Sequence, residues 1–380
     1  MTVIHSARLI TSGTVTENAW VRFDGDRVAE IGSGTGWPAD ADVVDAAGGV
    51  LTPGFVDIHV HGGGTASYDG DAAQIAHAMA THHEHGTTRT ALSLVTATQA
   101  DLRSQLALIA DLASDNPLIL GSHLEGPYLD HAHKGAHAPE LLADPQAEDI
   151  DALLAAARGT LVQITLAPEK PGAMAAIPRL VEAGVAVAVG HTAAGYEQAL
   201  AAFDAGASLL THAFNAMDGI YHRAPGPIGA ALARDHVTLE LINDGVHVHP
   251  AVAKMLWDAA PGRVALITDA MAAAGAADGD YVLGSLAVRV ERGTARLVEG
   301  GAIAGSTLTL DAALRQSVDV CGVSLVDAVD ALTRVPADAI GRRDIGRLEA
   351  GAAADAVLLT EQLEVTRVWG AGNALFTRAA

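Results

Sequence analysis

The sequence predicts an α/β protein in which a (β/α)8 barrel carries a small β-sandwich domain built from both termini. Between about residues 52 and 336, short apolar runs rich in β-branched residues alternate with helical stretches eight times. Both ends of the chain instead contain short strand-like runs separated by turn signals. Histidines and carboxylates follow six of the eight predicted barrel strands, at the end where such barrels place their sites.

Length and composition agree with this architecture. An α/β barrel alone extends to about 250 residues, so one barrel and a smaller domain account for 380 residues. Half of the residues are hydrophobic, only 4% are aromatic and 40 are glycine, which suits a core of small aliphatic side chains. The composition argues against disorder.

The charge balance limits the partners that we expect. Asp plus Glu number 45 against 23 Lys plus Arg, giving a net charge of −22. Such a surface repels nucleic acid and anionic membranes, so an anionic substrate needs a local group of cationic side chains. The single Cys321 excludes an intrachain disulfide, and no signal segment or membrane-length apolar run is present. We therefore expect a soluble cytoplasmic protein that binds neither nucleic acid nor membranes.

The two terminal segments are predicted to form one β domain. In residues 1–51, strands at 19–23 and 27–31 flank an Asp-Gly-Asp turn and read as a hairpin. In residues 337–380, strand-like runs return at 354–360 and 363–369. Because these segments flank the barrel of residues 52–336, we expect them to pair into a small sheet domain.

The barrel elements follow from apolar runs and helix start signals. Predicted strands cover residues 56–60, 89–95, 118–122, 161–166, 185–189, 208–210, 237–242 and 264–268. Predicted helices cover residues 71–85, 101–113, 149–157, 173–183, 196–205, 228–234 and 250–259, several of which open on Asp or Pro. An extra hairpin at 280–296 and helices near 308–320 and 325–332 complete the barrel. A doubly wound sheet is the alternative, but no strand precedes a G-x-G-x-x-G motif.

The first barrel strand ends in His59 and His61. A strand has a period of two, so both rings point to the same face. The glycines at 62–64 let the chain turn away without a side chain beside a bound ion. An isolated H-x-H more often marks structural histidines, so the interpretation depends on the later strands.

The later strands lead to further metal-ligand residue types. The third leads to His123 and Glu125, the fifth to His191, the sixth to His212 and the eighth to Asp269. The C-terminal ends of barrel strands meet at one mouth, so four histidines (His59, His61, His191 and His212) and two carboxylates (Glu125 and Asp269) converge there. This set predicts a metal site with an attached general base.

Most of the remaining histidines are not interpreted as metal ligands. We expect His77, His82, His83 and His85 to lie along or at the end of the first barrel helix, with the run at 82–85 forming a solvated helix end rather than a ligand cluster. His131 and His133 fall in the loop after the third strand, where we expect solvent exposure. His247 follows the seventh strand and is interpreted as functional, whereas the role of His249 stays open.

The motifs together resemble those of one enzyme family. The motifs are H-x-H after Pro-Gly-Phe-Val-Asp, His-Leu-Glu-Gly-Pro at 123–127, Gly-His-Thr at 190–192, Thr-His-Ala-Phe-Asn-Ala-Met at 211–217, Asn-Asp-Gly-Val-His at 243–247 and Thr-Asp-Ala at 268–270. As a set they resemble the motifs of the N-acetylglucosamine-6-phosphate deacetylases of the amidohydrolase superfamily. The resemblance runs from about Pro53 to Ser306, and the terminal segments resemble that family's small β domain.

The resemblance implies a role for each matching residue. Glu125, His191 and His212 would hold the principal metal, and Asp269 would be the catalytic base. His59 and His61 would hold a second ion bridged by Glu125. The sugar phosphate would contact Ala136, His137, Asn215, Ala216, Arg223, Asp244 and His247, with Ile303, Ala304 and Gly305 lining the site.

The implied reaction converts N-acetyl-D-glucosamine 6-phosphate to D-glucosamine 6-phosphate and acetate, within amino-sugar metabolism. The implied cofactor is one or two divalent ions per subunit, with Zn²⁺ favoured and Fe²⁺ or another divalent ion open. The implied assembly is a homodimer in which Arg223 reaches the phosphate in the neighbouring subunit.

Elementary chemistry agrees with this reaction. A bound metal lowers the pKa of water from about 15.7 to about 7, and Asp269 can take that proton and return it to the leaving amine. Another amidohydrolase activity, on a cyclic amide or an N-acyl amino acid, is the alternative, but such enzymes more often bridge their metals through a carboxylated lysine. Glu125 stands at the matching place. Intact ligands and Asp269 also disfavour a non-catalytic barrel scaffold.

Overall fold

The computed structural model describes residues 1–38 and 42–379 and contains the predicted barrel. Its parallel strands follow one another in chain order around the sheet. The barrel strands are β6 (Phe55–Val60), β9 (Thr87–Leu94), β10 (Ile119–Glu125), β11 (Leu161–Leu166), β12 (Ala186–Val189), β13 (Leu209–Leu210), β14 (Thr238–Ile242) and β15 (Val264–Ile267). The predicted eight-stranded barrel is confirmed.

The first and last strands meet at a seam that positions the site. The backbone N–H of Asp269 donates to the carbonyl of His59 at 2.8 Å, and that of His61 donates to Ala270 at 2.8 Å. The buried Asp57 carboxylate accepts a 2.6 Å hydrogen bond from the Thr268 hydroxyl. Backbone and side-chain bonds thus join β6 to β15 and bring the H-x-H pair beside Asp269.

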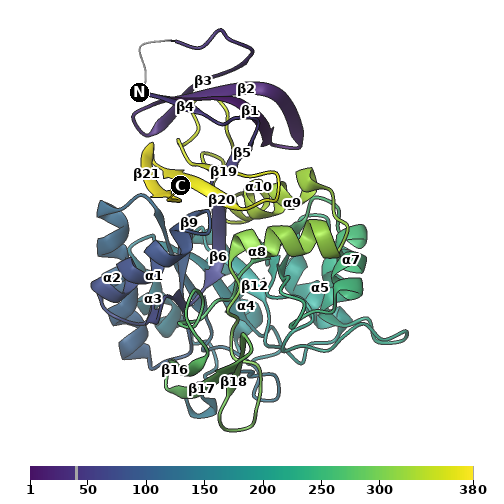
Figure 1. The fold of residues 1–380 in the computed structure, drawn as a ribbon. Coiled ribbons are helices and arrows are strands. Elements are labelled where there is room, and N and C mark those ends of the chain that lie inside the picture. Colours follow the sequence, from purple (N-terminus) through teal and green to yellow (C-terminus); the bar gives the residue numbers. More distant parts are fainter. Residues whose placement is uncertain (39–41, 380) are drawn as a thin grey trace.

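Helices cover the outside of the barrel (Figure 1). They are α1 (Ala72–His83), α2 (Gln99–Asp115), α3 (Ala147–Ala157), α4 (Ala173–Glu182), α5 (Tyr196–Asp204), α6 (Gly226–Leu232) and α7 (Pro250–Ala259). Each lies within a few residues of its prediction. Helix α1 illustrates why: Asp71 accepts from the backbone of Gln74, whose side chain in turn caps Asp71.

The segment after β15 both covers and closes the barrel. The predicted hairpin at 280–296 is part of a three-stranded antiparallel sheet of β16 (Gly279–Leu283), β17 (Leu286–Glu291) and β18 (Thr294–Leu297). Then come α8 (Leu310–Arg315), a π-helical turn (Gln316–Val320), α9 (Leu325–Leu332) and α10 (Arg334–Ala339). Short elements complete the barrel region: β7 (Gly62–Gly63), β8 (Ala66–Ser67) and a 3-10 turn (Pro139–Leu141).

Strands from both termini share a second sheet, in the order β21-β20-β19-β5-β1-β2-β3 with β4 against β1. They are β1 (Thr2–Thr11), β2 (Thr14–Asp24), β3 (Arg27–Ser33), β4 (Asp42–Asp45), β5 (Val50–Pro53), β19 (Ala356–Leu359), β20 (Val365–Gly370) and β21 (Asn373–Thr377). Phe23 from one end and Trp369 from the other pack in one buried core. The predicted small β-sandwich domain is confirmed, and we propose its division from the barrel near residues 51/52 and 336/337, positions that fall within β5 and α10.

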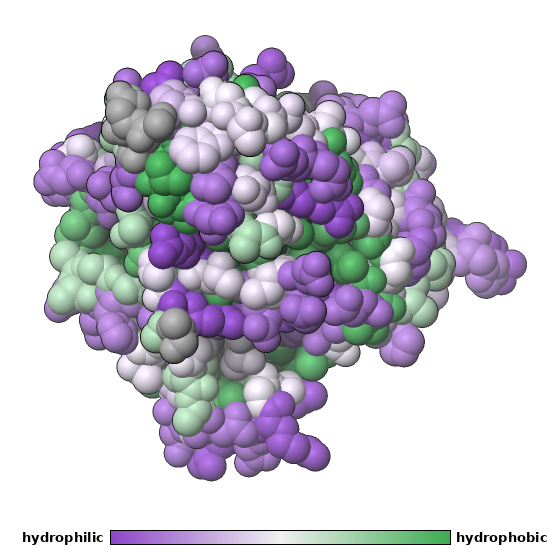
Figure 2. Space-filling view, turned by 45° about the horizontal axis from the view of Figure 1, so that its top comes forward, coloured by the Kyte–Doolittle hydropathy of each residue, from purple (hydrophilic) through white to green (hydrophobic). Residues whose placement is uncertain are grey.

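The small domain and the β16–β18 sheet lie at opposite ends of the barrel (Figure 1). The β16–β18 sheet sits at the end where the barrel strands finish, since Leu283 of β16 and Glu125 at the end of β10 line one cavity. Hydrophilic residues are spread over the face shown in Figure 2, with hydrophobic residues in smaller patches among them. Within the described residues, no helix is both long and apolar enough to cross a membrane.

The histidines near the end of α1 differ from their prediction. His82 is buried, and its Nε2 lies 2.9 Å from the carbonyl oxygen of Gly62. His83 is half-buried against the carbonyl of Thr87, and His85 contacts Asp311 at 3.0 Å. The prediction of a solvated helix end is therefore wrong for His82. The glycine-rich segment after β6 folds over the helix and supplies the acceptor.

Candidate active site

Five barrel strands deliver the predicted metal ligands and base to one point. His59 lies in β6 with His61 just after it, and Glu125 is the last residue of β10. His191 and His212 follow the ends of β12 and β13 by two residues, as Asp269 follows the end of β15. All six side chains are buried or nearly so. The parallel register explains the convergence, since equivalent strand ends meet at one mouth.

The backbone is strained where three of these residues leave their strands. The φ angles of His191, His212 and Asp269 are 47°, 24° and 48°, in the left-handed region that residues other than glycine rarely adopt. Each such residue costs about 1–3 kcal/mol and persists only where the surroundings impose it. Strain of this kind clusters at functional sites, because a sharp turn directs the side chain toward the site.

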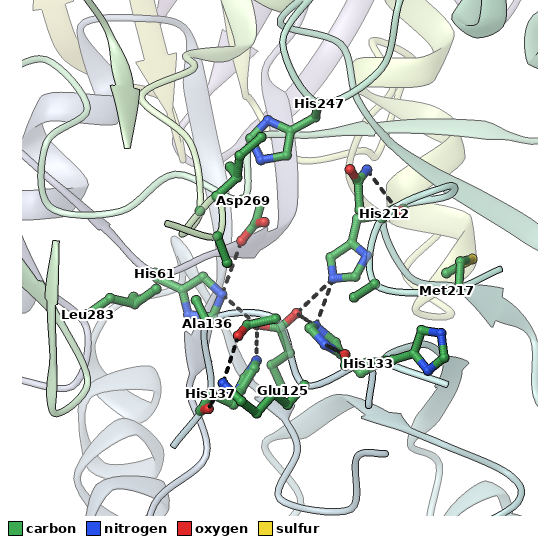
Figure 3. A pocket seen from close by; sticks show the side chains of 18 of the residues that line it. His61, Glu125, His133, Ala136, His137, His212, Met217, His247, Asp269 and Leu283 are labelled. Atoms are coloured by element: carbon green, nitrogen blue, oxygen red, sulfur yellow. Dashed lines mark hydrogen bonds and ion pairs between the residues drawn. The ribbon is translucent and has the colours of Figure 1, made fainter. Parts of the chain in front are cut away.

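The donor atoms form two groups that share Glu125. In the first, Glu125 Oε1 lies 3.0 Å from His191 Nε2 and 3.1 Å from His212 Nε2, and the two ring nitrogens are 3.0 Å apart. The second comprises His59, His61, Glu125 and Asp269, with donor atoms within 4.8 Å of one another. Figure 3 shows Glu125 between His212 on one side and His61 and His137 on the other.

The ring tautomers suit metal coordination. His191 Nδ1 lies 2.8 Å from the carbonyl oxygen of His133, which can only accept, so Nδ1 carries the proton and Nε2 faces Glu125. The Nε2 atoms of His59 and His61 are buried and make no hydrogen bond within the described residues. Unpartnered buried nitrogens are costly, and coordination would satisfy them. Histidine nitrogen and carboxylate oxygen are the ligands that Zn²⁺ takes in such sites.

Charges within the cluster stabilise one another. Burial alone would raise the pKa of Glu125, but His59 and the neighbouring rings of His137, His191 and His212 hold it well below its usual range. Burial would likewise raise the pKa of Asp269, but His59 and His61 lower it. Burial would lower the pKa of His61, whereas the nearby carboxylates of Asp269 and Glu125 raise it to about 9. Both carboxylates are therefore ionised at neutral pH.

A cavity of about 570 Å³ opens above this cluster. This volume suits one small polar molecule. Among its lining residues are His61, Glu125, His191, His212 and Asp269. The predicted substrate residues that also line it are Ala136, His137, Asn215, Ala216, His247, Ile303 and Gly305.

Comparison with known proteins identifies the family. The sequence model of the amidohydrolase family matches residues 50–375. The chain belongs to the amidohydrolase family. It is 38% identical to an N-acetylgalactosamine-6-phosphate deacetylase of Escherichia coli O157:H7, covering 98% of both chains, and 35% identical to an N-acetylglucosamine-6-phosphate deacetylase of Vibrio furnissii, covering 89% of this chain and 86% of that one.

Solved structures agree with this assignment. N-acetyl-D-glucosamine-6-phosphate deacetylase from Mycobacterium smegmatis, a mutant of which was solved with N-acetyl-D-glucosamine 6-phosphate, is 42% identical, with a TM-score of 0.94 and 99% of each chain covered. The corresponding enzyme from Pasteurella multocida is 28% identical, with a TM-score of 0.94, and 98% of this chain and 99% of that chain are covered. This amidohydrolase therefore shares its whole architecture with deacetylases of amino-sugar phosphates.

Three of the residues predicted to contact the substrate do not line the cavity. Ala304 is fully buried in an apolar cluster with Met271. Asp244 lies behind His247, with its Oδ2 2.7 Å from His247 Nδ1. Arg223 is exposed, in the segment between β13 and α6 that projects sideways from the barrel (Figure 1).

The structure also adds residues that the sequence interpretation missed. Lys134 lines the cavity, and no carboxylate within the described residues lies at ion-pair distance from its Nζ. The chain's other lysines, Lys170 and Lys254, are each paired with an aspartate. The sequence did contain an indication that Lys134 lies at the site, because it directly precedes the Gly-Ala-His segment at 135–137 and is a rare cation in a very acidic chain.

The loop that carries Lys134 also corrects a prediction. His131 is exposed as expected, but it lines the cavity rim. His133 is half-buried, lines the same cavity and contacts Asp130 at 2.9 Å, so the prediction of solvent exposure is wrong for His133. Its carbonyl oxygen is the acceptor for His191, which ties the loop to the metal ligands.

Proposed function

We propose that this amidohydrolase hydrolyses N-acetyl-D-glucosamine 6-phosphate to D-glucosamine 6-phosphate and acetate. The observation that carries the proposal is the convergence of Glu125, His191, His212 and Asp269 on the floor of a cavity of about 570 Å³. The relatives named for this activity, and the Mycobacterium smegmatis structure that contains the sugar phosphate, support the choice of substrate.

Glu125, His191 and His212 would hold the principal ion, and His59 and His61 a second ion that shares Glu125. We favour Zn²⁺ for this donor set, with Fe²⁺ or another divalent ion as the alternative. When bound, such an ion supplies an activated water and polarises the acetyl carbonyl.

Asp269 acts as base and then as acid. Its carboxylate is ionised, because His59 and His61 lower its pKa against the effect of burial, so it can accept the proton of the attacking water. Returned to the sugar nitrogen, the same proton makes the amine a good leaving group. Asp269 has a strained φ of 48°, and its side chain lines the cavity.

His247 and Lys134 supply positive charge for the sugar phosphate. Burial would lower the pKa of His247, but the hydrogen bond to Asp244 raises it. Protonation of the His247 ring is therefore favoured, and this ring lines the cavity. Lys134 has no competing carboxylate among the described residues, so its ammonium is available to a phosphate. Both offset the field of an overall anionic protein.

We further propose a homodimer in which Arg223 binds the phosphate held by the neighbouring subunit. Arg223 is exposed and does not line its own cavity, and its loop projects from the barrel (Figure 1). Two prolines, Pro225 and Pro227, stiffen the segment that follows it. A guanidinium matches the geometry of phosphate oxygens. We propose a cytoplasmic location, with no membrane or nucleic acid partner.

A second candidate substrate is N-acetyl-D-galactosamine 6-phosphate, because the relative from Escherichia coli O157:H7 is named for it and is 38% identical. The two sugars differ only at one hydroxyl, so a direct comparison separates them. Acetate release from each sugar phosphate, measured as kcat/KM, tests the assignment. We expect the glucosamine derivative to react faster, and the reverse order would reassign the substrate. Neither the cyclic-amide alternative nor the inert scaffold is favoured by the comparisons.

A further inference from the structure

Glu240 is a carboxylate that the proposed reaction does not use. It lies in β14 with no exposed surface, inside the barrel. Burying a carboxylate is costly unless hydrogen bonds satisfy it. Glu240 has three such partners: His59 Nδ1 at 3.0 Å, Gln163 Nε2 at 2.7 Å and the backbone N–H of His212 at 3.3 Å.

The contact with His59 fixes the state of that ring. A carboxylate can only accept, so Nδ1 of His59 carries a proton and Nε2 is the nitrogen that faces the site. This Nε2 lies 3.3 Å from Glu125 Oε1 and 3.5 Å from Asp269 Oδ1. The same Glu240 oxygen accepts from the backbone of His212, so one carboxylate contacts both groups of ligands.

His61 lacks an equivalent support. Its Nδ1 is buried and makes no hydrogen bond within the described residues, whereas His59 is held from behind. Of the two histidines in the H-x-H pair, His59 is therefore the one whose direction is fixed. Carboxylates in this position orient histidine ligands and increase their basicity, and losing them costs about 10- to 100-fold in metal affinity.

We propose that Glu240 is a positioning residue that orients His59 and thereby determines whether the second metal position is filled. The inference rests on the proposed metal-dependent function. The principal position depends on Glu240 much less, because Glu125, His191 and His212 receive only a backbone contact from it.

Zn²⁺ content after equilibrium dialysis at a series of free Zn²⁺ concentrations tests this proposal. The parent is compared with Glu240→Leu, which removes the acceptor, and with Glu240→Gln, which keeps an acceptor oxygen but loses the charge. The carbonyl oxygen of Gln163 has no partner in the described residues, so a rotated Gln163 amide can accept from the amide that Glu240→Gln introduces. Thr165→Val is the matched control, because it removes a buried hydroxyl of the barrel interior that contacts His123 and Thr211 but not His59.

We expect two ions per subunit in the parent and in Thr165→Val, and one in Glu240→Leu. Glu240→Gln should bind its second ion about 10- to 100-fold more weakly than the parent and its first ion normally. Should Glu240→Leu fail to fold, Glu240→Gln alone carries the test. Parent affinity for the second ion in Glu240→Gln, equal loss of both ions, or a parent with a single ion would overturn the inference. A parent that binds no ion and releases no acetate would instead overturn the proposed function.

Discussion

Oδ1 of Asp269 lies 3.3 Å from Nε2 of His61, so the proposed base is in contact with the H-x-H pair rather than with His191 or His212. The seam between β6 and β15 creates this relationship, because backbone hydrogen bonds tie Asp269 to His59 and His61 to Ala270. The base is thus held by the same bonds that close the barrel.

Asp269→Asn should fold and retain its metal but lose turnover by about 10²- to 10⁴-fold, since an amide neither accepts nor returns the proton. Asparagine tolerates the left-handed backbone at this position, so the substitution leaves the turn intact. Acetate release and metal content are measured on the same sample. A rate within a few-fold of the parent would place the base elsewhere.

His212→Ala should lose the principal ion, whereas His59→Ala should empty only the second position. His212 supplies one donor of a three-residue group, while His59 belongs only to the other group. Elemental analysis of the purified variants distinguishes the two. The assignment would be contradicted by a His212→Ala protein with the metal content of the parent.

Lys134→Met should raise KM for the phosphorylated sugar about 10-fold or more, with a smaller change in kcat, because a charge-assisted contact remote from the amide is lost. Lys170→Met is the control, since Lys170 is paired with Asp144 at 2.7 Å and does not line the cavity. Activity on unphosphorylated N-acetylglucosamine should not change in Lys134→Met. An equal loss on both sugars would exclude a phosphate contact.

Arg223→Ala should raise KM for the phosphorylated sugar with a smaller effect on kcat, and mixing this variant with Asp269→Asn should restore some activity. If Arg223 acts across a dimer interface, the mixed dimer contains one site in which both residues are intact. The measurement is acetate release after subunit exchange, with the exchange verified independently. Absence of recovery, or a monomer in sedimentation, would show that Arg223 does not act across the interface.

Stability should depend on pH through Asp311. Burial would raise the pKa of Asp311, but the hydrogen bond from His85 and the nearby Arg315 lower it to about 2. Because the folded-state pKa lies below the unfolded value of 3.8, the stabilisation is complete above about pH 5 and is lost as the pH falls toward 2.

The full stabilisation is about 2 kcal/mol. The difference in unfolding free energy between the parent and Asp311→Asn should therefore be about 1 kcal/mol smaller at pH 3 than at pH 6. Urea unfolding at the two pH values measures it. A difference that is constant with pH would mean that the contact with His85 does not stabilise the ionised carboxylate.

The sequence predicts the barrel because its strands are short, largely buried runs rich in apolar and β-branched residues that alternate with helices, with caps such as Asp71 marking helix starts. The metal ligands were predictable because strand ends of a parallel barrel converge. Periodicity carries no information about contacts between distant elements. The closure of the seam by Asp57 and Thr268, the burial of His82 beneath Gly62 and the support of His59 by Glu240 therefore emerge only in the structure.

Loops were predicted least well. Lys134 and His133 lie in a long segment without regular structure, where no pattern indicates which side chains turn inward. Glu240 did carry a signal, as a charged residue in the middle of an otherwise apolar strand. A buried charged residue needs a hydrogen-bonding partner, and the sequence does not indicate which residues partner Glu240.

The central claim is metal-dependent deacetylation of a sugar phosphate, and one assay tests it most directly. Acetate release from N-acetyl-D-glucosamine 6-phosphate is measured with the purified protein, after metal removal by a chelator, and after return of Zn²⁺ or Fe²⁺, beside the unphosphorylated sugar. We predict rapid release that chelation abolishes and metal restores, with much lower kcat/KM for the unphosphorylated sugar. Full activity in the metal-depleted protein, or no acetate release under any of these conditions, would contradict the account.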